Sequence, residues 1–152
     1  MTLLERRRKL LTEHIDILRA VFKAARQRRP FTVEAIVILP DHLHCIWTLP
    51  EGDADFSGQW QDIKARFAAH ISVRRLKKGE RGIWQRRLWE HAIRDERDFE
   101  RHVNYIHYNP VKHGHMTMVA DWPYLSFHRY VRSGIYNPDW AADDDVRRLE
   151  ME

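Results

Sequence analysis

Two histidines separated by one residue form the clearest metal-ligating pattern in this sequence. His42 and His44 follow Pro40-Asp41 at the start of a segment whose composition predicts a β-strand. Side chains alternate faces along a strand, so both imidazoles point the same way and Leu43 points into the core. Two such imidazoles, about 7 Å apart at the backbone, can converge on one metal ion. The same pattern is also common on solvated strand faces that bind nothing, so further ligands decide the matter.

A tyrosine and an amide in a later predicted helix are candidates to complete such a site. Tyr105 and Asn109 are four residues apart, so their side chains are neighbours on one helix flank. At about 100° per residue, Tyr108 points nearly the opposite way, toward solvent. The Asn109 carbonyl oxygen would give the two histidines a third ligand, leaving open positions that suit Mg²⁺ or Mn²⁺ with a phosphate oxygen. A tyrosine on such a flank is also typical of half-buried packing.

Zinc is the alternative ion for the histidine pair. A structural zinc site is normally closed by four ligands, and a chain whose single cysteine is Cys45 cannot supply the usual set. The single cysteine also excludes an internal disulfide, which is consistent with a cytoplasmic protein.

The charge pattern indicates a polyanion as partner. The formal net charge is +4, and the basic residues gather in clusters rather than spreading evenly. Such clusters hold phosphates without reading base sequence. A solvated basic surface with no partner is the alternative interpretation. The candidates for contacts to a nucleic-acid backbone are Arg74, Arg75, Lys77, Lys78, Arg86 and Arg87.

Length and composition fit a single folded domain over residues 1–152. Apolar residues make up 43% and charged residues 32%, a balance typical of folded domains rather than disordered chains. No apolar run approaches the roughly 20 residues that span a bilayer, and the N-terminus lacks the pattern of a secretory signal. We therefore expect a cytoplasmic protein with no membrane partner.

The expected architecture is an α+β sandwich, in which an antiparallel sheet carries helices on one face. Apolar residues spaced by three and four predict the helices, and runs of β-branched residues predict the strands. The expected elements are a short first strand within residues 1–4, a helix over 11–28, a hairpin of strands over 31–39 and 42–49, a second helix ending in a turn at 78–82, a strand over 84–93, a third helix from 95, a short helix within 122–136, and a loosely held tail from about 139.

Polar residues and a proline predict where the later helices begin and end. Ser57 is a plausible N-cap for the second helix, and Asp95 caps the third, with Asp98 completing a capping box. Proline lacks a backbone donor and disfavours helix before it, so the third helix should stop or kink near Asn109-Pro110. Tyr105 then lies in the last turns of that helix.

Two stretches of this sequence resemble a family of DNA-processing enzymes. Leu39-Pro40-Asp41-His42-Leu43-His44 and Tyr105-Ile106-His107-Tyr108-Asn109-Pro110-Val111-Lys112-His113-Gly114 are similar to motifs of the REP-associated tyrosine transposases. These form a branch of the single-tyrosine HUH transposases, where HUH denotes two histidines around an apolar residue. The likeness also covers residues 82–91 and 121–127 and extends over roughly residues 10–140, nearly the whole chain.

The resemblance implies a ferredoxin-like fold, a divalent-metal site and a tyrosine nucleophile. His42 and His44 would be the HUH ligands, with Asn109 as the third. Tyr105 would be the nucleophile of a transposase that cleaves and rejoins single-stranded DNA through a 5′-phosphotyrosine intermediate. The substrates of the family are palindromic repeats that fold into hairpins. The resemblance favours a monomer associated with the nucleoid, whereas insertion-sequence relatives form homodimers.

Two other functions stay open from the sequence. A domesticated relative could bind DNA hairpins sequence-specifically without cutting them, although the presence of all four proposed site residues argues against this. The chain could also be a structural-zinc protein, which metal analysis of the purified protein would decide.

Overall fold

The chain divides into two compact units that are interleaved along the sequence. The computed structural model describes residues 9–75 (side chains to 71), 84 and 90–150. Helices and buried apolar side chains are found in both units. The first unit comprises Met1–Thr32, Pro40–His42 and Trp47–Leu88, and the second comprises Val33–Leu39, Leu43–Ile46 and Trp89–Glu152.

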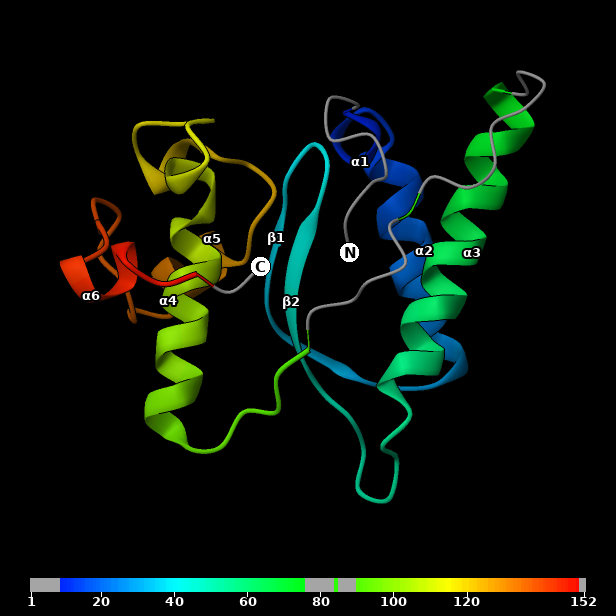
Figure 1. The fold of residues 1–152 in the computed structure, drawn as a ribbon, viewed down its shortest axis with the longest axis horizontal. Coiled ribbons are helices and arrows are strands. Elements are labelled where there is room, and N and C mark those ends of the chain that lie inside the picture. The colour runs from blue at the N-terminus through cyan, green and yellow to red at the C-terminus, as the bar shows by residue number, and fades with distance from the viewer. Residues whose placement is uncertain (1–8, 76–83, 85–89, 151–152) are drawn as a thin grey trace. The chain divides into compact units, whose positions relative to one another are not determined.

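The predicted hairpin is present. β1 spans Thr32–Ile38 and β2 spans Leu43–Thr48, and the two pair as an antiparallel sheet (Figure 1). An isolated antiparallel bridge joins Val37 of β1 to Leu125. Leu43 is buried, as predicted. The α+β class is thereby confirmed, while the strand predicted within residues 1–4 lies outside the described residues.

Two long helices lie side by side in the first unit. α1 spans Leu10–Glu13, α2 spans Ile15–Arg28 and α3 spans Phe56–Arg75 (Figure 1). The single helix predicted over residues 11–28 is interrupted at His14, whose φ of −114° and ψ of 36° are not helical. None of the described helices is both long enough and apolar enough to cross a membrane.

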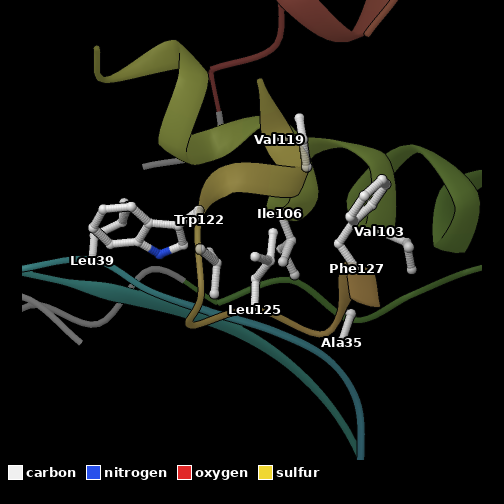
Figure 2. Close-up of a cluster of buried hydrophobic side chains, with 9 residues drawn as sticks. Ala35, Leu39, Val103, Ile106, Val119, Trp122, Leu125 and Phe127 are labelled. Atoms are coloured by element: carbon white, nitrogen blue, oxygen red, sulfur yellow. The ribbon is translucent and has the colours of Figure 1, made fainter. Parts of the chain in front are cut away.

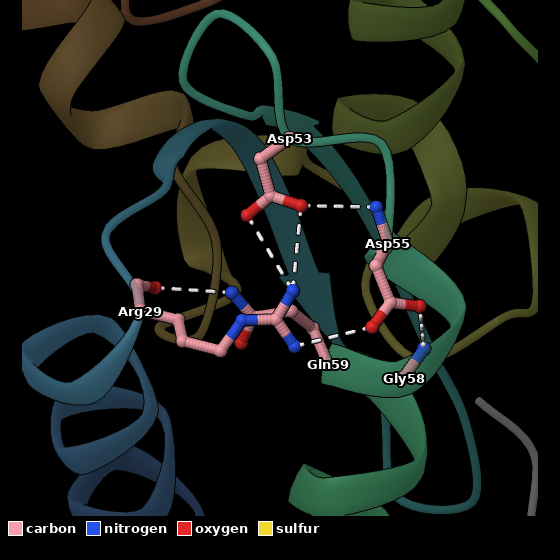
Figure 3. A network of polar contacts seen from close by, with 5 residues as sticks. All are labelled: Arg29, Asp53, Asp55, Gly58 and Gln59. Atoms are coloured by element: carbon pink, nitrogen blue, oxygen red, sulfur yellow. Dashed lines mark hydrogen bonds and ion pairs between the residues drawn. The ribbon is translucent and has the colours of Figure 1, made fainter.

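The start of α3 corrects one predicted cap. The Asp55 carboxylate accepts a hydrogen bond from the Gly58 N–H at 3.0 Å, so Asp55 caps the helix instead of Ser57. The same carboxylate lies 3.3 Å from the Arg29 guanidinium, which also reaches Asp53 at 3.3 Å (Figure 3). A single acidic loop therefore both caps α3 and ties it to the residue that follows α2.

The second unit is built around α4, which spans Glu96–Lys112. The 3₁₀-helix η1 (Val119–Asp121) and the helices α5 (Phe127–Arg132) and α6 (Asp144–Arg147) follow it. The main chain of β1 is tied to the segment after η1, because Trp122 Nε1 donates to Ile38 O at 3.0 Å. The buried core between β1, α4 and that segment contains Ala35, Val37, Leu39, Val103, Ile106, Val119, Trp122, Leu125 and Phe127 (Figure 2).

α4 ends two residues after Pro110, close to the place where the sequence predicted that it would stop or kink. Pro110 lies in the last turn, so its missing N–H costs the helix a single bond near its end. The helix then closes with a Schellman motif, in which Gly114 N–H donates to Val111 O at 3.0 Å and His115 N–H donates to Pro110 O at 2.9 Å. Gly114 has a φ of +73°, which is why glycine suits this position. Lys112 is thereby the last helical residue.

Two other predictions are wrong in the second unit. Residues 90–93, expected to end a strand, have no regular secondary structure, and residues 76–83 and 85–89 of the predicted turn and strand lie outside the described residues. The tail expected to be loosely held from 139 forms α6, and its Ala142 and Val146 are buried. α6 contacts α4, so apolar residues in this acidic segment fix it to the body of the unit.

Candidate functional site

The flank of α4 that carries the predicted site residues is enclosed rather than wet. Asp98, His102, Tyr105 and Asn109 follow one another at spacings of four, three and four, and all four are buried. Tyr105 is 1% exposed and Asn109 is 0% exposed. Tyr108, predicted to face solvent, is half-buried. The polar groups on this flank therefore sit where electrostatic interactions are stronger than in water.

Tyr105 meets one of the predicted metal ligands within the second unit. The aromatic ring of Tyr105 in α4 and the imidazole ring of His44 in β2 pack edge to face. Their centroids are 5.7 Å apart and their planes meet at 80°. The fold thus brings together two site residues from distant parts of the sequence. Because Tyr105 is buried, a substrate can reach its hydroxyl only after neighbouring side chains move.

A lysine that the sequence interpretation did not single out lies against the tyrosine hydroxyl. Lys112 Nζ donates to Tyr105 Oη at 3.2 Å and lies 4.8 Å from the ring centroid. The same ammonium donates to Leu149 O at 3.0 Å and to Glu150 Oε2 at 3.1 Å. Burial lowers the pKa of Lys112, but the bonds to Tyr105 and Glu150 outweigh it and raise that pKa above its ordinary value. The seven-residue spacing on one helix was the available signal.

His42, another predicted ligand, has surroundings compatible with metal ligation. His42 directly precedes β2, is 3% exposed, and its Nδ1 lies 2.7 Å from Asp41 Oδ1. A carboxylate accepts hydrogen bonds, so Nδ1 donates to Asp41 and Nε2 is the nitrogen that could ligate a metal ion. A carboxylate behind the imidazole is the usual support of a histidine ligand. His42 belongs to the first unit, and His44 and Asn109 belong to the second. Imidazole nitrogens and an amide oxygen are donor types that can bind a divalent ion.

A second group of metal-ligating side chains was not predicted. His91 Nε2 lies 2.8 Å from Asp98 Oδ2, and His102 Nδ1 lies 3.1 Å from Asp98 Oδ1. The two imidazoles stack with centroids 4.6 Å apart, and the three ligand atoms lie within 4.8 Å of one another, so the group could hold a divalent ion. The bond from His91 and the one from Arg94 N–H hold the pKa of Asp98 well below its usual range. The predicted Asp95 cap is confirmed beside it, accepting from Asp98 N–H at 2.8 Å.

The predicted phosphate contacts fall mostly outside the part of the chain that the structure describes. Lys77, Lys78, Arg86 and Arg87 lie there, and Arg74 and Arg75 lie in the last turn of α3 with undescribed side chains. Their role stays a prediction.

Known proteins similar to this chain bear one family name. A REP-associated tyrosine transposase of Escherichia coli is 49% identical over 143 residues, covering 94% of this chain and 82% of that protein. A Haemophilus influenzae protein, provisionally given the same name, is 42% identical over 97% of this chain and 88% of its own length. A solved structure described as the REP-associated tyrosine transposase bound to a REP hairpin superposes with a TM-score of 0.85 at 48% identity, covering 93% of this chain and 82% of that one. No protein-family model matches the sequence.

Proposed function

Because this chain belongs to the REP-associated tyrosine transposases, we propose that it cleaves and rejoins single-stranded DNA at repeat hairpins with Tyr105 as nucleophile. The observation that carries this proposal is the contact between Tyr105 and His44 in the second unit. The relative of known structure is described as bound to a REP hairpin, which supports hairpin DNA as the substrate here. We propose that the chain acts as a monomer on DNA of the nucleoid.

The proposed reaction is a transesterification. Tyr105 Oη attacks the scissile phosphorus in line, the phenol proton passes to solvent, and the bond from phosphorus to O3′ breaks. The products are a 5′-phosphotyrosine ester and a 3′ end whose oxygen has taken up a proton. Since a phenol has a pKa of about 10, the phenolate is a good enough leaving group for a 3′-hydroxyl to reverse the step. Strands can therefore be rejoined without a nucleotide cofactor.

His42, His44 and Asn109 would hold the divalent ion, Mg²⁺ or Mn²⁺. When bound, such an ion supplies polarisation of the scissile phosphate and offsets charge on its oxygens. Three features support this placement of the ion: the nitrogen and oxygen donors of these side chains, the Asp41 carboxylate hydrogen-bonded to His42, and the contact between His44 and Tyr105. The group of His91, Asp98 and His102 is the alternative place for an ion.

Mn²⁺ binding separates the two metal locations. We expect His44→Gln to weaken Mn²⁺ binding to the purified chain by more than tenfold, measured by electron paramagnetic resonance of free Mn²⁺. His102→Gln is the matched control, with an imidazole removed from the other group, and should leave that binding within about twofold. The reverse result would move the ion to the other group.

Covalent adduct formation tests the nucleophile. The full chain is incubated with a repeat-hairpin oligonucleotide and Mn²⁺ or Mg²⁺, and the products are resolved on a denaturing gel. We expect an adduct from the parent chain and from Tyr108→Phe, and none from Tyr105→Phe. An adduct of undiminished yield from Tyr105→Phe would refute the proposal.

A hairpin-binding protein without cleavage is the second candidate function. The burial of Tyr105 favours it, because a phenol that is 1% exposed cannot contact a phosphate as it stands. Tight hairpin binding with no adduct under any divalent ion would establish this function in place of the first. Binding and adduct yield should therefore be measured on the same samples.

A further inference from the structure

We propose that the Lys112 ammonium assists the nucleophile by stabilising negative charge on Tyr105 Oη. This inference rests on the proposed function, in which that oxygen attacks phosphorus and later departs from it. The direct observation is the hydrogen bond of 3.2 Å from Nζ to Oη, with the same ammonium 4.8 Å from the ring centroid.

The pair is built into one helix. Lys112 follows Tyr105 by seven residues, which is two turns of α4, so both side chains lie on the same face. The other two partners of Lys112, Leu149 and Glu150, belong to the C-terminal segment. If that segment moves to admit a substrate, Lys112 loses two acceptors and keeps the third. The carbonyl of residue 149 and the carboxylate of residue 150 then no longer share the Lys112 ammonium with Tyr105.

The surroundings of Tyr105 make a nearby cation important for a phenolate at this position. Tyr105 is 1% exposed, and burial disfavours a phenolate because the charge loses its hydration. The helix dipole favours the ammonium of Lys112, because Lys112 is the last residue of α4. The side chain of Lys112 is 16% exposed, so solvent screens the pair only in part. The Glu150 carboxylate faces the same ammonium but is 81% exposed, and His44 contributes the edge of its ring to Tyr105.

The balance of charge extends through the whole proposed reaction. When Tyr105 gives its proton to solvent, the hydrogen bond from Lys112 becomes a charge-assisted one. When the ester forms, Oη becomes neutral and the ammonium lies next to the incoming phosphate. When a 3′-hydroxyl displaces the tyrosine, the phenolate returns to the same ammonium. Lys112 keeps its proton throughout.

A structural role for Lys112 is the competing explanation, since it also tethers residues 149 and 150. Three variants of the full chain separate the roles. Lys112→Met removes the charge and the tether, Lys112→Arg keeps a cation, and Glu150→Gln removes the ion pair with the tail while leaving the contact to Tyr105. Circular dichroism reports whether each variant folds.

The first measurement is the pH dependence of the tyrosine absorbance, taken with no DNA. Subtracting the curve of a Tyr105→Phe chain isolates Tyr105. We expect Lys112→Met to raise the apparent pKa of Tyr105 by about one unit or more, the scale of a lost charge-assisted bond. Glu150→Gln should not raise it. An unchanged Tyr105 titration in Lys112→Met would overturn the inference, even if adduct formation itself were demonstrated.

The second measurement is the pH profile of adduct formation. One unit in the pKa of the nucleophile corresponds to about tenfold in the reactive fraction at neutral pH. Lys112→Met should therefore slow adduct formation about tenfold at pH 7 and recover toward high pH, and Lys112→Arg should restore much of the rate. Equal rates for the Met and Arg variants would show that the charge is not what matters. Because the titration needs no substrate, it distinguishes failure of this inference from failure of the proposed function.

Discussion

The two ends of the buried flank of α4 hold polar groups of opposite design. Near the N-terminus, the Asp98 carboxylate accepts hydrogen bonds from His91 and from Arg94 N–H, and His102 Nδ1 lies 3.1 Å from it, so its charge is already matched by nearby groups. Near the C-terminus, the Lys112 ammonium donates to the Tyr105 hydroxyl and to the Glu150 carboxylate. The charge at the first end is matched by donors close to it in the chain, whereas the cation at the second end shares its contacts between an exposed carboxylate and a phenol.

The comparison separates stability from chemistry along one helix. A carboxylate in the first turn interacts favourably with the positive end of the helix dipole, and an ammonium in the last turn with the negative end. The charged side chain at each end therefore stabilises the helix. The lesson is that a cation whose carboxylate partner is exposed can also stabilise negative charge on a neighbouring phenol, whereas a buried carboxylate matched by its donors mainly holds the fold.

Replacing Asp98 should cost the fold more stability than replacing His107 or Gly114. Asp98→Asn keeps the shape but turns an acceptor-only group into one that cannot accept from every donor around it. We expect Tm to fall by several degrees at pH 7, measured by calorimetry. The pKa of Asp98 is lowered by folding, so its contribution is complete above pH 4 and is lost as the pH falls below about 4. The parent and variant Tm values should converge there. A difference independent of pH would contradict this assignment.

His107 supplies a second pH dependence from the core-facing side of α4. Burial, followed by the charges of Arg129 and His128, lowers the pKa of His107 to about 3, while Nε2 hydrogen-bonds Ser126 Oγ at 2.8 Å. The unfolded chain takes up a proton near pH 6.5 and the folded chain does not. Stability should therefore fall, by up to a few kcal/mol, as the pH drops from about 6.5 toward 3.

Urea unfolding at pH 7 and pH 4.5 measures this loss. His107→Gln should be less stable than the parent at pH 7 but should lose less between the two pH values. A variant with the same pH dependence as the parent would show that other groups are responsible.

Substitution of Gly114, just after the end of α4, should give the smallest loss of stability. Gly114→Ala places a side chain at a φ of +73° in open space, so the cost is a backbone one of about 1 kcal/mol. For a chain of this size that is a fall in Tm of roughly 2–4 °C. Gly114→Asn should cost less, because asparagine tolerates this conformation. Equal costs for the two variants would mean that the backbone conformation is not the cause.

Much of the fold followed from local patterns, and the misses have identifiable physical causes. The β-branched run before Pro40 predicted β1, and the Asp95 cap predicted the start of α4. Pro110 predicted the end of α4 to within two residues, because the helix extends only to Lys112. The tail from about 139 was expected to be loosely held, although Ala142 and Val146 are buried. Contacts across the sequence decided these points.

The candidate site was predictable only where spacing carries the information. Tyr105 and Asn109 are neighbours on a helix whatever the rest of the chain does. The contact of Tyr105 with His44 depends on β2 meeting α4, which the family resemblance suggested and no local pattern contains. Lys112 could have been found by counting two turns along the helix. The partnership of His91 with Asp98 could not, because residues 90–93 are irregular.

The most direct test of the account is the site of the covalent bond to DNA. The adduct formed with a repeat hairpin would be digested with protease and nuclease, and the modified peptide would be sequenced by mass spectrometry. We expect the residual nucleotide on Tyr105. Its recovery on Tyr108 or on any other residue, from a chain shown to form the adduct, would contradict the assignment of Tyr105 as the nucleophile.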